Sequence, residues 1–99
     1  MPFTDALPTL GDVVHGGAIS SLIDTAAATA AWSGAEVPEK PRASTVGLTV
    51  DFLTPARGQG IKADARVVRR AGRGLCFCEV RVFAEDGTHV AQALVTYQL

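Results

Sequence analysis

The chain has 99 residues, of which 47% are hydrophobic, and its formal net charge at pH 7 is −1. This length predicts one domain over residues 1–99 with a small core, and domains of this size often gain further burial by oligomerising. The near-zero net charge argues against nucleic-acid or membrane partners that are recognised through bulk electrostatics.

The first fourteen residues are rich in turn formers, and only Phe3 to Leu7 suggests a small strand or turn. They lack the basic and apolar regions of a signal peptide, so we expect a cytoplasmic protein. Gly16 to Gly34 is the first regular element: its Ala-rich interior favours a helix, and Ser33-Gly34 supplies a stop. A membrane span is disfavoured because the segment consists of small residues and carries Asp24 near its centre.

After a predicted loop over Gly34 to Ala43, the sequence changes to β-branched, aromatic and alternating runs. The separators "TPARGQ", "AGRG" and "EDGT" are typical of turns, and the last contains the Asp-Gly pair of tight hairpins. One helix followed by four closely linked strands predicts an α+β fold with an antiparallel meander. Because the helix is apolar nearly all round, we expect the sheet to curl around it. The predicted strands are Ser44 to Leu53, Gly60 to Arg70, Leu75 to Glu85 and His89 to Gln98.

The two cysteines of the chain, Cys76 and Cys78, lie two positions apart in a predicted strand, so they share a face and cannot form a suitable disulfide. We interpret them as reduced packing residues. No second Cys or His pair accompanies them at metal-ligand spacing, so no metal site is expected.

The stretch "VVHGGAISSLIDTAAATAAW" resembles the His-Gly-Gly and helix-Asp signature of hotdog-fold acyl-CoA thioesterases, specifically the phenylacetyl-CoA thioesterase-like (PaaI-like) branch. The downstream Phe-Leu-x-Pro-Ala turn and the Gly-Arg and Asp-Gly hairpins are also similar to that branch, and the resemblance covers Gly11 to Leu99. It implies a hotdog fold, in which a curved antiparallel sheet wraps one long central helix. It also implies hydrolysis of an acyl-CoA thioester without a metal or redox cofactor.

The resemblance assigns a role to each matching position. Asp24 matches the carboxylate that activates water or attacks the thioester carbonyl, and Gly16 matches the glycine whose backbone N–H polarises that carbonyl. His15 matches the motif histidine that shapes this end of the site, and Thr45 matches a Ser/Thr position that orients water. Two departures stand out: only fourteen residues precede His15, where members have a longer first strand, and Thr9 replaces a common Asn or Gln.

The residues themselves favour the same chemistry. The N–H groups at a helix start can stabilise an oxyanion, and Gly16 and Gly17 let a ligand approach the backbone closely. Asp24 stands eight residues after Gly16, about 12 Å along a helix, so one thioester carbonyl cannot reach both. We therefore predict an obligate homodimer in which Gly16 of one chain faces Asp24 of the other, with a dimer of dimers as a further option.

Each of these residues also has a purely structural interpretation. His15 could bond to backbone at the helix start, and Gly16-Gly17 could be a structural turn. Asp24 could bond to a hydroxyl such as Ser20 or to the helix end of a partner chain, and Thr45 could be an ordinary strand residue. Trp32 is predicted to fill the core or an interface, and His89 to lie on the surface.

Four arginines cluster within residues 66–73, and they either contact a phosphate-bearing ligand or form a solvated strand end. Arg70 and Arg73 are candidate ligands of the CoA phosphates.

Two other functions stay open at this point. A hotdog hydratase or dehydratase would use His15 as its base, although an Asp on the helix counts against it. A non-catalytic dimer that binds acyl-CoA, or is purely structural, is the other alternative.

Overall fold

A computed structural model describes residues 1, 8–10, 13–14, 16–33 and 43–99 of the chain. The helix ends close to the predicted stop, and all four long strands lie within one residue of their predicted bounds. The predicted loop over 34–43, except its last residue, and the small element predicted over 3–7 lie outside the described residues. The elements are β1 (Pro8–Leu10), β2 (Val13–Val14), α1 (Gly16–Trp32), β3 (Ser44–Phe52), β4 (Ile61–Arg70), the short 3-10 helix η1 (Gly72–Gly74), β5 (Leu75–Ala84) and β6 (His89–Gln98).

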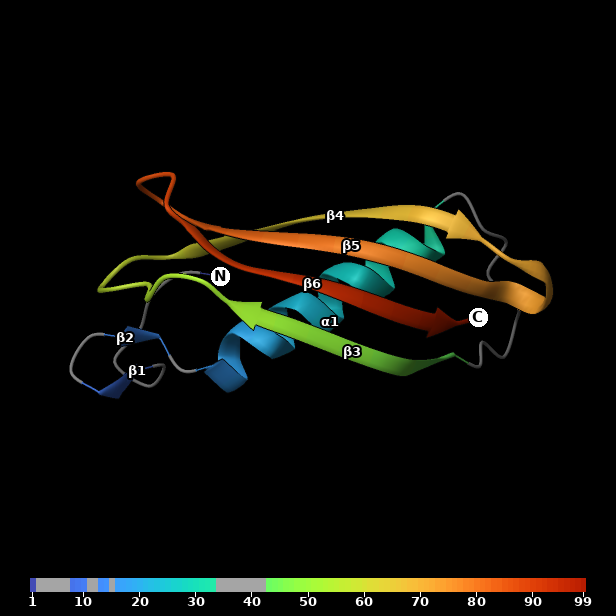
Figure 1. Ribbon diagram of the computed structural model, residues 1–99, viewed down its shortest axis with the longest axis horizontal. Coiled ribbons are helices and arrows are strands. Elements are labelled where there is room, and N and C mark those ends of the chain that lie inside the picture. Colours follow the sequence, from blue (N-terminus) through green and yellow to red (C-terminus); the bar gives the residue numbers. More distant parts are fainter. Residues whose placement is uncertain (2–7, 11–12, 15, 34–42) are drawn as a thin grey trace.

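Helix α1 lies on one face of a four-stranded antiparallel sheet, as predicted for an α+β chain (Figure 1). The stripe that faces the sheet repeats every four residues and is buried: Ile19, Ile23, Ala27 and Ala31. The opposite stripe, Gly17, Ser21, Thr25 and Thr29, is exposed.

Within the single chain the sheet packs against one side of the helix and leaves the opposite stripe exposed. The physical reason is visible along the exposed stripe. Thr25 Oγ1 donates a hydrogen bond to the Ser21 carbonyl, and Thr29 Oγ1 to the Thr25 carbonyl, each at 2.9 Å. Small side chains with satisfied hydroxyls face water at little cost.

The strand order is β3-β6-β5-β4, which corrects the predicted meander in one respect. Strands β4, β5 and β6 follow one another as predicted, but β3 pairs with β6 at the far edge from β4. The connection over residues 53–60 makes this possible. It has to cross three strand spacings, about 14 Å in all, and an extended chain covers about 3.3 Å per residue.

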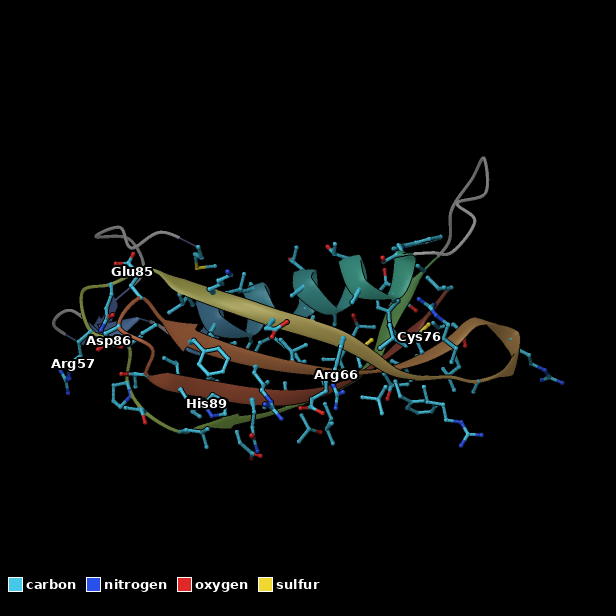
Figure 2. All side chains as sticks on the ribbon, turned by 90° about the horizontal axis from the view of Figure 1, so that it is seen from above. Arg57, Arg66, Cys76, Glu85, Asp86 and His89 are labelled. Atoms are coloured by element: carbon cyan, nitrogen blue, oxygen red, sulfur yellow. The ribbon has the colours of Figure 1, made fainter. Side chains whose placement is uncertain are left out.

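Strict alternation gives the sheet an inner face against α1 and an outer face away from it. In β5 the buried inner residues are Cys76, Cys78, Val80, Val82 and Ala84. The two cysteines are free and share this inner face, which confirms that they are packing residues. Figure 2 views the helix and sheet as two layers, with Cys76 on the helix side and His89 on the other.

Both predicted hairpin turns form. In the β5–β6 turn Gly87 has φ +89°, and the Thr88 amide donates to Asp86 Oδ1 at 2.9 Å. In the β4–β5 turn Arg73 has φ +67°, a left-handed conformation that is uncommon for a residue other than glycine.

The two short strands near the N-terminus were not predicted. Strand β1 pairs antiparallel with β2, and Thr9 lies within β1. Separately, the Met1 ammonium donates to the Ile61 carbonyl at 2.7 Å and the Ile61 amide donates back to the Met1 carbonyl at 2.8 Å. Among the described residues, no helix has the length and apolar character needed to cross a bilayer.

Candidate active site

Asp24 lies halfway along α1, and a strand residue holds its carboxylate. Thr45 Oγ1, near the start of β3, donates a hydrogen bond to Asp24 Oδ1 at 2.5 Å. Both side chains are half-buried. Within the part of the chain that the structure describes, no Lys, Arg or His side chain forms an ion pair with Asp24, so one neutral hydroxyl orients the carboxylate.

The partner of Asp24 is therefore one of the residues that the resemblance assigned to the site. Ser20, the alternative local partner, has no side-chain hydrogen bond to Asp24. Thr45 is separated from Asp24 by 21 positions in the sequence, so the fold itself brings them together. The hydroxyl that was predicted to orient water donates its hydrogen to the Asp24 carboxylate, and its role toward water stays a prediction.

The start of the helix forms the second part of the site. Gly16 is the first residue of α1 and is half-buried, whereas Gly17 is exposed. The first N–H groups of a helix have no partner within the helix and carry its positive dipole end, so they suit a developing oxyanion. His15, which precedes them, lies outside the described residues.

The continuous helix separates Gly16 from Asp24 within one chain. Eight residues at about 1.5 Å each place them about 12 Å apart, as expected from the sequence. Reacting groups must lie about 3 Å apart, so these two residues of the same chain do not form one reaction centre.

An aromatic side chain that the sequence analysis did not single out lies at the helix start. The Phe52 ring carbons Cζ and Cε1 lie 3.4 and 3.5 Å from the position that a Cβ on Gly16 would occupy. Figure 1 shows the end of β3 beside the first turn of α1. In the sequence, Phe52 is the first residue of the Phe-Leu-x-Pro-Ala turn and lies at the end of a predicted strand, but its position beside Gly16 depends on the fold.

The two arginines proposed as phosphate ligands have different surroundings. The Arg70 guanidinium donates to the Ala31 carbonyl at 2.9 Å and to the Ser33 carbonyl at 2.8 Å, so it caps the C-terminal end of α1. Arg73 is exposed at the tip of the β4–β5 turn. The carbonyl partners explain the position of Arg70 without a ligand, and the phosphate role of both residues stays a prediction.

Trp32 and His89 lie outside the candidate site, as expected. Trp32 is partly buried and packs against the core, which fits its predicted filling role. His89 lies on the outer face of the sheet beside the Asp-Gly turn, where it was predicted. It is half-buried and stacks on Phe83, with ring centroids 4.9 Å apart, and its Nε2 has no hydrogen-bond partner among the described residues.

Two titratable groups outside the candidate site, Glu79 and Cys78, have structural explanations. Glu79, on the outer face, accepts hydrogen bonds from Arg66 at 3.2 Å and Arg81 at 3.0 Å, and these arginines hold its pKa below its usual range. Burial raises the pKa of the Cys78 thiol, and the nearby Cys76 adds to this effect. A raised pKa leaves less of the reactive thiolate, so Cys78 is a poor nucleophile.

The outer face also carries two surface hollows. One, of about 210 Å³, is lined by Thr49, Asp51, Glu79, Gln92, Ala93 and Leu94. The other is lined by Asp64, Arg66, Glu79 and Arg81. Neither hollow is lined by Asp24 or Thr45, which lie where the middle of α1 meets the start of the edge strand β3. No group of three or more potential metal ligands occurs among the described residues.

Comparisons with solved structures support this fold. The structure superposes on that of BH2602 from Bacillus halodurans, which was solved with CoA, with a TM-score of 0.87. The two sequences are 24% identical, and the match covers 99% of this chain and 67% of that chain. The PaaI protein of the Escherichia coli phenylacetic acid degradation operon gives a TM-score of 0.84 at 24% identity, covering 99% of this chain and 67% of that one. The predicted hotdog architecture is thereby confirmed.

Two curated relatives match most of the chain. One is VNG_1336C of Halobacterium salinarum, provisionally named an esterase, with 48% identity over 86% of this chain and 54% of that protein. The other is the medium/long-chain acyl-CoA thioesterase YigI of Salmonella typhimurium, with 30% identity over 88% of this chain and 63% of that protein. The chain thus spans between half and two thirds of the length of these relatives.

The family itself is settled by a direct match. The sequence model of the thioesterase superfamily matches residues 11–91 of this chain, which include the helix, the strand with Thr45 and most of the sheet. This confirms the resemblance inferred from the His-Gly-Gly and helix-Asp signature. The chain belongs to the thioesterase superfamily.

Proposed function

We propose that this protein is an acyl-CoA thioesterase that hydrolyses a small aryl-CoA or a short- to medium-chain acyl-CoA to the free acid and CoA. The observation that carries the proposal is the Asp24 carboxylate, held by Thr45 Oγ1 at an open edge of the fold. The names of the Salmonella relative, an acyl-CoA thioesterase, and of PaaI, from a phenylacetic acid operon, support the substrate class.

The proposed reaction uses only side-chain and backbone groups. Asp24 takes a proton from water as the water oxygen attacks the thioester carbon, and the carbonyl oxygen becomes an oxyanion. The Gly16 N–H donates to that oxyanion, and one such donor is typically worth about 3 kcal/mol in the transition state. When the intermediate collapses, the C–S bond breaks and the sulfur of CoA receives the proton. In the variant with Asp24 as nucleophile, its oxygen attacks the thioester carbon, and the C–S bond breaks to give a mixed anhydride and the CoA thiolate. Water then attacks the anhydride, which releases the free acid and restores the Asp24 carboxylate, and the proton lost by water goes to the CoA sulfur.

No metal or redox step enters this scheme, so we propose that no cofactor is required. The CoA moiety is part of the substrate, and its phosphates would lie near Arg73, with Arg70 a weaker candidate because helix carbonyls already accept its hydrogen bonds. Gly17 would border the thioester, and His15 would shape the same end of the site.

The proposed active form is a homodimer. The distance of about 12 Å between Gly16 and Asp24 in one helix requires a second chain to complete each site. Strand β3 supports this proposal: it is an edge strand of nine residues, and its inner-facing Leu48 is exposed. Long exposed edges with apolar side chains are sites of strand or subunit association. Pairing of dimers into tetramers and a cytoplasmic location remain predictions from the sequence.

The activity test measures thiol release from a panel of acyl-CoAs. We expect Asp24→Asn to lower turnover by about 10² or more, because a general base contributes at least that factor. Asp51→Asn is the matched control, since Asp51 is an exposed carboxylate on the adjacent strand. A wild-type protein that cleaves no thioester contradicts the proposal, as does a loss below tenfold in Asp24→Asn. Binding without thiol release would favour the non-catalytic acyl-CoA-binding alternative.

A mixing experiment tests the shared site. Gly16→Pro removes the proposed N–H donor, and proline is tolerated at the first position of a helix. Gly16→Ala keeps the N–H and is the control. Mixed one to one, the inactive Asp24→Asn and Gly16→Pro proteins should recover about a quarter of wild-type activity, because half of the dimers are mixed and each has one intact site. A mixture that stays inactive although mixed dimers have formed would place both groups of a site in one chain.

A further inference from the structure

The inner face of β3 carries large apolar side chains that remain exposed in the part of the chain that the structure describes. Phe52 is 57% exposed and Leu48 is 38% exposed. In the sheet these residues pair with Ala91 and Val95 of β6, which are both buried on the face that packs against α1. Phe52 and Leu48 therefore face the helix side of the sheet and not the outer solvent.

Their exposure follows from the position of the helix. Helix α1 packs mainly against β4 and β5 and makes its weakest contact with β3. Beyond the edge of the helix, the inner face of β3 remains open. An exposed aromatic ring keeps a large apolar area in water, which is unfavourable unless something covers it.

The Phe52 ring also lies at a defined place relative to the proposed chemistry. Its edge is in van der Waals range of the Gly16 position at the start of α1. Thr45, at the opposite end of β3, is bonded to Asp24. A thioester carbonyl bound at the Gly16 N–H would therefore have its acyl group within reach of the Phe52 ring.

We propose that Phe52 is the specificity-determining residue of the acyl subsite, and that its ring covers one side of an aryl or medium-chain acyl group. This inference rests on the proposed function, because it places the acyl group by the position of the thioester. It adds a preference to that function: short acyl groups such as acetyl do not extend far enough to use the ring, whereas hexanoyl and phenylacetyl groups do.

The test compares kcat/KM for acetyl-CoA, hexanoyl-CoA and phenylacetyl-CoA in the wild type, Phe52→Ala and Phe52→Leu. We expect Phe52→Ala to lower kcat/KM about tenfold or more for the two larger substrates and less than about threefold for acetyl-CoA, in the range of lost apolar pocket contacts. Phe52→Leu should recover hexanoyl-CoA more than phenylacetyl-CoA. Leu94→Ala is the control: Leu94 is 66% exposed and pairs with Thr49 and Glu79, away from Phe52.

A change in the ratio between substrates is the readout that a merely structural role would not produce. An equal loss for all three substrates in a folded variant overturns the inference, and so does a profile that matches the wild type. Thermal unfolding of each variant shows whether the comparison is made on folded protein.

A binding measurement separates this inference from the proposed function. Calorimetric titration of Asp24→Asn, with and without Phe52→Ala, compares hexanoyl-CoA with free CoA. If Phe52→Ala weakens hexanoyl-CoA about tenfold but leaves CoA unchanged, the acyl subsite is supported even when the wild type hydrolyses nothing. If Phe52→Ala changes neither the affinity for hexanoyl-CoA nor that for free CoA, the acyl subsite is wrong, whatever the wild-type activity.

Discussion

The two edges of the sheet differ in how far helix α1 covers them. On β4, Ile61 is buried and Ala63, Ala65 and Val67 are half-buried beneath α1, and Arg70 at its end caps the helix. On β3 no residue is buried, and only Thr45 and Val50 are half-buried. The same fold thus has one edge that the helix covers and one that it leaves open.

This difference separates the parts of the molecule that stabilise it from those that we propose to be functional. Contacts on the β4 side are apolar apart from the Arg70 cap, and they form within one chain. On the β3 side, Thr45 donates a hydrogen bond to Asp24 and the Phe52 ring lies beside Gly16. Substitutions on the β4 side should therefore change stability, and those on the β3 side should change activity.

The largest expected effect comes from a matched pair of apolar truncations, one on each edge. Ile61→Ala removes a buried side chain and should lower the free energy of unfolding by about 2–4 kcal/mol. Phe52→Ala removes an exposed one and should cost the isolated chain less than about 1 kcal/mol. Denaturant unfolding of both variants measures the contrast.

In a domain of this size, Ile61→Ala could be too unstable to measure. Ile61→Val then serves, with an expected loss of about 0.5–1.5 kcal/mol. A Phe52→Ala loss as large as that of Ile61→Ala would show that the open edge also carries stability. In a dimer that observation would indicate that Phe52 is covered by the partner.

The second effect concerns the hydrogen bond between the open edge and the helix. Thr45→Val keeps the shape of the side chain and removes the donor to Asp24, so we expect a loss of activity of about tenfold with little change in melting temperature. Thr45→Ser keeps a hydroxyl and should retain most of the activity. Steady-state kinetics beside thermal unfolding distinguishes the two roles: a fall in stability without a fall in activity would make Asp24 and Thr45 a structural pair.

Features of this contrast that depend on neighbouring residues could be predicted from the sequence, whereas features that depend on the packing of distant elements could not. The strands followed from side-chain alternation, and α1 from its Ala-rich interior, because both patterns act within a few residues. The placement of β3 beside β6 did not follow, since turn residues do not specify which strand becomes the neighbour. Asp24 and Thr45 were selected by resemblance and do meet, whereas Phe52 was missed because its exposure depends on the helix lying toward β4.

The third effect tests the cap on the covered edge. Arg70→Ala removes donors to the carbonyls of Ala31 and Ser33 at the end of α1, and we expect a loss of about 1–2 kcal/mol in the free energy of unfolding. Arg69→Ala, next to it on the outer face, is the control and should change stability by less than about 0.5 kcal/mol. An equal loss in both variants would mean that general charge, and not the cap, is responsible.

The smallest expected effect concerns the end of the sheet where the β3–β4 connection crosses, away from both edges. Gln59 in that connection donates to Asp86 Oδ2 at 3.2 Å and accepts a hydrogen bond from the Asp86 amide at 3.1 Å. Hydrogen bonds from Thr88, and then from Gln59, hold the pKa of Asp86 below its usual range. A lowered pKa in the folded state contributes stability above the unfolded pKa of about 3.9 and loses it as the pH falls through the folded value.

Asp86→Asn should therefore lower the melting temperature slightly at pH 7, by less than Arg70→Ala does, and the gap from the wild type should close as the pH falls below about 4. Melting curves at pH 7, 5 and 3 measure it, and a gap that stays constant over this range would show that the charge on Asp86 is irrelevant. Since the connection touches the β5–β6 turn and not the site, thiol release should be unchanged at pH 7. A loss of activity would mean that the crossing connection sets the position of β3 and hence of Thr45, which would tie the open edge to the end of the sheet.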